Sequence, residues 1–134
     1  MGYASIQNMP TFVLFFFIAA ILVAVYLFIY TWATAHNEFD LIRRNNVAAA
    51  LSLGLSLMGF ALPLSSAVVN SATAIDLAVW GAVGLVVQIF VYWLVRLVLP
   101  NLSERIAGGE VASALFLGAS SLAAGVITAA AMTF

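Results

Sequence analysis

Gln88 is the strongly polar side chain nearest the middle of a long apolar run, and its amide could serve permeation or helix packing. At 100° per residue, Gly81, Gly84 and Tyr92 fall within an arc of about 80° with it, which makes a small and polar stripe on one helix face. The stripe could line a path or ligand site for a small ion or solute. Alternatively, Gln88 makes an interhelical hydrogen bond of about 1 kcal/mol beside closely packed glycines.

Pro63 lies inside another apolar run, where it leaves one backbone carbonyl available either for permeation or for helix packing. A proline has no N–H, so it frees the carbonyl of Gly59 from its helical hydrogen bond. Ser65 and Ser66 lie nearby. The sequence leaves open a simple packing kink, which neighbouring helices would satisfy, and a carbonyl that faces a small ion.

The sequence contains few of the residue patterns that catalysis requires. There is no cysteine, and we find no nucleophile-and-base pair or phosphate-binding loop. His36 is the only histidine, and with Glu38 and Asp40 it makes a weak metal constellation. We therefore expect a non-enzyme with no catalytic residue, cofactor or metal.

The elements that carry these residues are four long apolar runs, at about 11–33, 47–69, 77–99 and 111–134. Each is close to the ~20 residues that a helix needs to cross a bilayer, and none shows the alternation of a barrel strand. The chain is 66% hydrophobic and 7% charged, with a mean hydropathy of +1.19. The sequence predicts an all-α integral membrane four-helix bundle in a single domain, 1–134. The first run, rich in aromatic side chains, should face lipid.

The charges predict an orientation. All of the basic side chains lie toward the loops after the first and third runs: Arg43, Arg44, Arg96 and Arg105. The positive-inside rule then places both long loops in the cytoplasm and both termini in the periplasm. We expect these arginines to contact membrane lipids at the interface. A net charge of −1 without lysine argues against nucleic acid as a partner.

An internal repeat organises the runs. Residues 46–54 align with 110–118 at an offset of 64, which predicts two tandem, parallel helical hairpins at about 11–70 and 75–134. Because the copies are not inverted, the argument that places a transport site at the midplane of an inverted repeat does not apply directly.

Both long loops have the same cap pattern. Asn37 and Asn101 are expected to cap short interfacial helices, with Asp40 and Glu104 returning a bond at the third position.

Two rows of small residues could bring helices close together: Ser121, Gly125 and Ala129, and Ala48, Ser52 and Ser56. They suit packing within one copy or between copies, and the sequence does not separate these. We expect a homo-oligomer.

The segment 46–63, followed by Trp80, Gln88 and the stretch 100–106, resembles the bacterial domain-of-unknown-function family 350 over nearly the whole chain. The resemblance implies a bacterial inner-membrane protein of duplicated helix pairs, and it supplies no reaction or ligand. Family members tend to be encoded near membrane-stress or polyamine-conjugation genes, which points to a cytoplasmic stress-response protein as partner.

Two functions follow from these observations. The leading hypothesis is an oligomeric small channel or transporter that uses the Gln88 stripe and the Pro63 kink. The alternative is a membrane scaffold or anchor that recruits a cytoplasmic envelope-stress partner through the loops around Arg43 and Arg105.

Overall fold

The computed structural model describes residues 9–33 and 38–132, and the elements found there are helices. In chain order they are α2 (Met9–Ala33), α3 (Glu38–Arg43), α4 (Val47–Asn70), α5 (Ala74–Val98), α6 (Leu102–Ala107) and α7 (Val111–Ala131). Four of them, α2, α4, α5 and α7, are long and apolar enough to cross a membrane. The predicted all-α architecture and the four apolar spans are confirmed.

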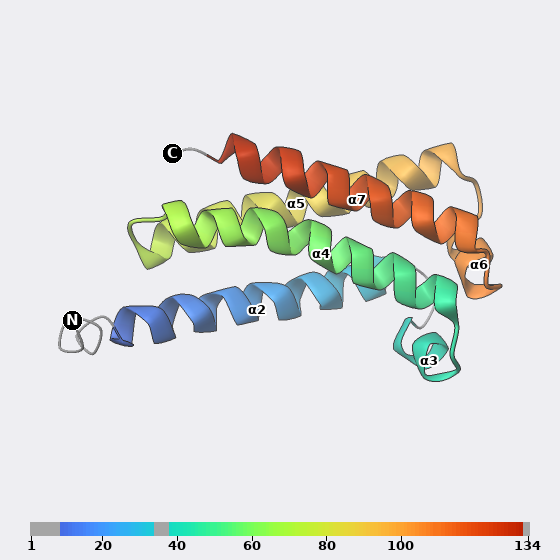
Figure 1. Cartoon of the computed structure of the whole chain (residues 1–134), viewed down its shortest axis with the longest axis horizontal. Coiled ribbons are helices and arrows are strands. Elements are labelled where there is room, and N and C mark those ends of the chain that lie inside the picture. The colour runs from blue at the N-terminus through green and yellow to red at the C-terminus, as the bar shows by residue number, and fades with distance from the viewer. Residues whose placement is uncertain (1–8, 34–37, 133–134) are drawn as a thin grey trace.

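The four long helices lie side by side and run alternately in opposite directions (Figure 1). The start of α2, the α4–α5 turn and the end of α7 lie at one end of the molecule, and α3 and α6 lie at the other. The most extensive contact joins α4 to α7, while α5 packs against α2, α4 and α7. The core therefore lies between α4, α5 and α7, with α2 at its edge.

Local signals explain where the long helices begin. The Asn46 side chain accepts a hydrogen bond of 3.0 Å from the Ala49 N–H and so caps α4. The Thr73 hydroxyl accepts one of 3.1 Å from the Asp76 N–H at the start of α5. Asn45 and Gly109 have φ of 65° and 88°, and each reverses the chain before the next long helix.

The predicted cap at Asn101 is wrong. This residue precedes α6 with φ 60° and makes no side-chain cap bond. A capping side chain needs extended backbone so that its oxygen can return to the first turn, and the left-handed conformation of Asn101 prevents this. The matching Asn37 lies outside the described residues.

The aromatic side chains of α2 face partly outward and partly into the bundle. Phe12, Phe28 and Trp32 are among those that face outward, as a lipid-facing helix requires. Tyr26 and Tyr30 are instead buried, and the Tyr26 hydroxyl donates a 3.2 Å hydrogen bond to the Ser56 carbonyl. The hydroxyl explains the burial of Tyr26, since a hydroxyl in hydrocarbon is costly without a partner, and Tyr30 packs its ring against those of Tyr26 and Tyr92.

Candidate functional site

Gln88 lies where α5 meets the crossing of α4 and α7. Its amide nitrogen donates to the Gly59 carbonyl at 2.9 Å and to the Ser121 carbonyl at 3.1 Å. The Ser121 hydroxyl donates back to the Gln88 Oε1 at 2.8 Å. Gln88 and Ser121 are 1% and 2% exposed. We call Gln88, Gly59, Pro63, Ser121 and Gly125 the three-helix junction.

The three-helix junction supplies a hydrogen-bond donor for the carbonyl that Pro63 leaves unpaired within α4. Pro63 lies inside α4 and cannot donate to Gly59, four residues earlier. The Gln88 amide supplies the missing donor from a different helix. The polar side chain of α5 and the freed carbonyl of α4 thus satisfy each other.

Two glycines allow α4 and α7 to meet at backbone distance. A Cβ on Gly125 would overlap the Gly59 carbonyl oxygen and lie 2.8 Å from its carbon. A Cβ on Gly59 would in turn lie 2.7 Å from the Ser121 carbonyl carbon and 3.1 Å from Gln88 Oε1. Any side chain here would separate the helices and pull the acceptors away from the amide.

The other residues of the Gln88 stripe are buried on the same face, but they meet different neighbours. Gly84 packs against Pro63, whose Cβ would be 3.2 Å from an added Cβ, and Gly81 packs against Leu22 of α2. The Tyr92 hydroxyl lies 3.2 Å from that of Ser103, beyond the end of the span. The stripe is therefore a packing face in which Gly84 contacts the three-helix junction through Pro63 and Gln88 supplies its hydrogen bonds.

The chemistry available to the junction is that of hydrogen bonding between helices. Both amide hydrogens of Gln88 and one lone pair of its oxygen are engaged by protein groups. In this arrangement the amide donors are directed at carbonyls and not at a passing solute. A permeation path along Gln88 would require α5 to move away from α4 and α7.

The small-residue rows face mostly into the molecule. Ser121 and Gly125 of α7 and Ser52 and Ser56 of α4 are buried within the single chain. Ala129 is half-buried, and its carbonyl accepts a 2.9 Å bond from the Ser66 hydroxyl. These rows pack α4 and α7 against each other, and their burial removes the argument that linked them to assembly.

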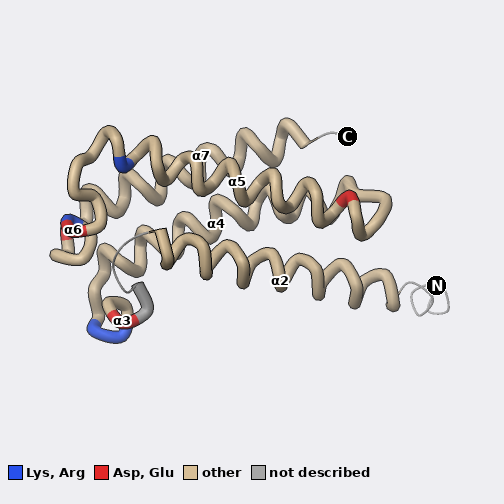
Figure 2. Tube along the Cα trace, turned by 180° about the vertical axis from the view of Figure 1, so that it is seen from behind, with Lys and Arg blue, Asp and Glu red and all other residues tan. Residues whose placement is uncertain are grey.

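A second candidate region is the end that holds α3 and α6, here called the arginine end. Figure 2 shows the basic residues at this end, with acidic residues beside them at α3 and α6, and Asp76 lies in the first turn of α5 at the opposite end. The basic residues are Arg43, Arg44, Arg96 and Arg105. Arg44 pairs with Asp40 at 3.1 Å, and both are substantially exposed, so the pair adds little stability.

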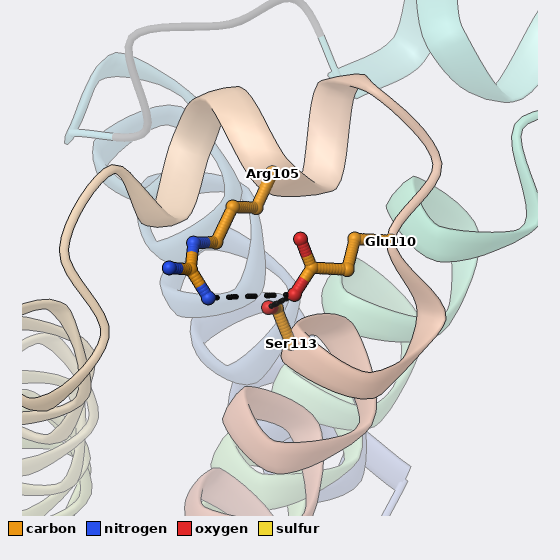
Figure 3. A network of polar contacts seen from close by, with 3 residues as sticks. All are labelled: Arg105, Glu110 and Ser113. Atoms are coloured by element: carbon orange, nitrogen blue, oxygen red, sulfur yellow. Dashed lines mark hydrogen bonds and ion pairs between the residues drawn. The ribbon is translucent and has the colours of Figure 1, made fainter.

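Arg105 belongs to a small network on the same end (Figure 3). Its guanidinium lies 3.5 Å from the Glu110 carboxylate, which also accepts a 2.6 Å bond from the Ser113 hydroxyl. Glu110 directly precedes α7, so the network joins α6 to the start of that helix.

Asn46 connects the two loops of the arginine end. While its oxygen caps α4, its amide nitrogen donates to the Ala107 carbonyl at the end of α6, at 3.0 Å. Leu102 and Ile106 bury the other face of α6, each 1% exposed. The arginine end is thus a packed surface.

Sequence reasoning missed two of these roles. The row of small residues predicts only close packing for Ser121, although a hydroxyl in the middle of a span is itself a candidate partner for a buried amide. The bond from Asn46 to α6 had no local signal, because it joins positions 61 apart.

The described residues hold no group of three or more His, Asp or Glu side chains that could bind a metal. His36 of the weak constellation lies outside them.

Comparisons with known proteins place the chain in context. A family model described as "Domain of Unknown Function (DUF350)" matches residues 4–132. Two curated relatives are each 41% identical over 129 residues, which is 96% of this chain and 98% of theirs. Both are described as "UPF0719 inner membrane protein YjfL", from Escherichia coli strain K12 and Escherichia coli O157:H7. No solved structure matches.

Proposed function

Since this chain belongs to the DUF350 family and is a multi-pass integral protein of the inner membrane, we propose that it is a non-enzymatic scaffold or anchor for a cytoplasmic partner. The scaffold was the alternative hypothesis from the sequence, and we now prefer it to the channel. The reason is that the Gln88 amide and the Gly59 carbonyl freed by Pro63, the basis of the channel hypothesis, are hydrogen-bonded to each other between helices.

The observation that carries this proposal is the packed arginine end. Four arginines gather there, and Asn46 joins its two loops through the bond to Ala107. A pre-ordered surface loses less conformational entropy when a partner binds than flexible loops would. The exposed Arg43 and Arg44 would favour a partner with an acidic surface.

Photo-crosslinking in cells tests the proposal. A crosslinking amino acid at Glu104, exposed on α6, should give discrete adducts with one cytoplasmic protein, and Arg43→Glu with Arg44→Glu should abolish them. The matched control is the same crosslinker at Ile75, exposed at the opposite end, which should give no such adduct. No adduct at Glu104, or adducts that survive the charge reversal, would count against the scaffold.

One observation favours the second candidate, an oligomeric small channel. The outward face of α4 carries its own small residues, Ala50, Gly54, Ala61 and Ser65, all exposed and within an arc of about 60°. An added Cβ on Gly54 would have no neighbour within 4 Å. Small side chains on this face would let α4 of another copy approach closely, and a path for a small ion could then lie between the copies.

Gly54→Leu separates this candidate from the scaffold. The change should leave the single chain folded but reduce association in native mass measurements and any ion flux in liposomes. Unmodified protein that stays monomeric in lipid and carries no flux would exclude the channel and leave the scaffold in place.

We also propose that the chain is a tandem duplication of one hairpin. The short helices end at 43 and 107 and the following long helices begin at 47 and 111, so both pairs differ by 64. The left-handed residues Asn45 and Gly109 keep the same spacing. If the halves are true duplicates, a chain with the halves exchanged in order should fold and insert, and failure to do so would argue against equivalent units.

A further inference from the structure

We propose that the groove between α2 and α5 at the arginine end binds one anionic phospholipid, with the phosphate at Arg96 and an acyl chain along α5. The site shares Arg96 with the arginine end, but it involves neither Arg43 and Arg44, whose reversal tests the scaffold, nor the outward face of α4, which tests the channel.

The apolar part of the site is a groove of about 370 Å³. It is lined by Ile29 of α2 and by Leu85, Val86, Ile89, Phe90 and Trp93 of α5. The two helices run in the same direction here and pack against each other, so the groove follows their length (Figure 1). A chain of methylene groups is the ligand that such a lining accommodates.

The polar part adjoins it toward the end of α5. A hollow of about 360 Å³ is lined by Trp93, Arg96 and Leu97. Trp93 lines both spaces, so one ligand can occupy the apolar groove and reach Arg96. An indole between an apolar and a charged region is typical of the level where lipid headgroups begin.

Arg96 differs from two of the other arginines in its neighbours. Arg44 and Arg105 lie beside the carboxylates of Asp40 and Glu110. Within the described part of the chain, no carboxylate lies within ion-pair distance of Arg96, which sits in the last turn of α5. Its planar guanidinium presents paired donors that match two phosphate oxygens.

Charge and shape together favour a lipid over other occupants. An inorganic phosphate would use Arg96 and leave the apolar groove unfilled. A second copy of the chain would cover the groove but would have to bring an acidic group to Arg96. In a parallel copy Asp40 and Glu110 already pair with Arg44 and Arg105, which leaves, among the described side chains, the exposed Glu104 to meet Arg96, and the second test below decides between this dimer and a lipid.

The first test measures lipid retention by the full chain. Protein purified in neutral detergent is mixed with phosphatidylglycerol or with phosphatidylcholine of the same acyl chains and examined by native mass spectrometry. We expect one phosphatidylglycerol to be retained in preference, and Arg96→Gln to reduce its retention about fivefold. Arg44→Gln removes an equal charge outside the groove and should leave the preferential retention of one phosphatidylglycerol in place.

The second test locates the acyl chain. The chain has three tryptophans, so Trp32→Phe with Trp80→Phe leaves Trp93 as the single fluorophore. Phosphatidylglycerol brominated in mid-chain should quench it strongly, and Arg96→Gln should reduce that quenching. Soluble glycerol phosphate should neither quench nor compete.

Three outcomes would overturn the proposal. Equal retention of the two lipids, with or without Arg96, would show general lipid contact. If glycerol phosphate displaced phosphatidylglycerol completely, Arg96 would be a site for a free phosphate and not for a lipid. A dimer whose formation protects Trp93 from the brominated lipid would assign the groove to a second copy. Circular dichroism of each variant verifies that a lost signal is not lost folding.

Discussion

A single amide connects three helices in this molecule. Gln88 can serve the Gly59 carbonyl and the Ser121 hydroxyl together because an amide both donates and accepts. An interhelical hydrogen bond in a membrane contributes about 0.6 kcal/mol on average. Leaving a buried carbonyl unpaired costs about 1–3 kcal/mol, so the stranded Gly59 carbonyl would dominate the effect of losing Gln88.

The first prediction follows from that comparison. Gln88→Leu should lower the free energy of unfolding by about 1–3 kcal/mol, measured by denaturant titration in mixed micelles. In a Pro63→Ala background the new N–H can serve Gly59, and the cost of Gln88→Leu should fall by about 1 kcal/mol. Additive effects of the two changes would show that the amide does not serve the carbonyl freed by Pro63. As a control, Ser65→Ala at an exposed position should show no coupling to Gln88→Leu.

The long helices differ in how firmly they are held. α4 and α7 meet at backbone distance through Gly59 and Gly125, and α5 adds the three-helix junction. α2 contributes few buried side chains and touches mainly α5. A helix held by fewer buried contacts opens more readily, so α2 is the span that we expect to show the least protection in hydrogen exchange.

The second prediction compares two glycines in paired helices. Gly125→Ala should lower the free energy of unfolding by about 1–3 kcal/mol, because the new methyl overlaps Gly59 backbone that has no room to move. Gly54→Ala should be neutral or raise it by up to about 1 kcal/mol, since its Cβ meets nothing and alanine favours helix. Both are measured by the same unfolding titration. Equal effects would mean that the α4–α7 crossing is not as close as described.

The arginines of the whole molecule all lie at one end. Four of the five carboxylates lie at the same end, and the fifth, Asp76, lies in the first turn of α5 at the other. Translocated loops seldom carry arginine, so we propose that the arginine end faces the cytoplasm and the termini face the periplasm.

Cysteine labelling provides the third prediction, since the natural chain contains none. With a membrane-impermeant maleimide, Ala72→Cys at the α4–α5 turn should react in intact cells. Gly108→Cys, beside α6, should react only after the membrane is permeabilised. Both positions are exposed, so accessibility to reagent does not depend on unfolding. Labelling of Gly108→Cys in intact cells would reverse the orientation.

The four membrane helices follow from the amino-acid sequence alone, because a backbone in hydrocarbon must satisfy its own polar groups and the apolar runs have the length of a span. The sequence also shows two local needs, a donor for the Gly59 carbonyl and a partner for Gln88. That these two groups bind each other depends on the packing of the helices, since the two residues are 29 positions apart and on different helices. Likewise, periodicity identified rows of small residues, but the crossing of α4 and α7 decided that Gly125 packs inside while Gly54 faces outward. Which face turns inward depends on the side chains of every neighbouring helix, and a single segment does not contain that information.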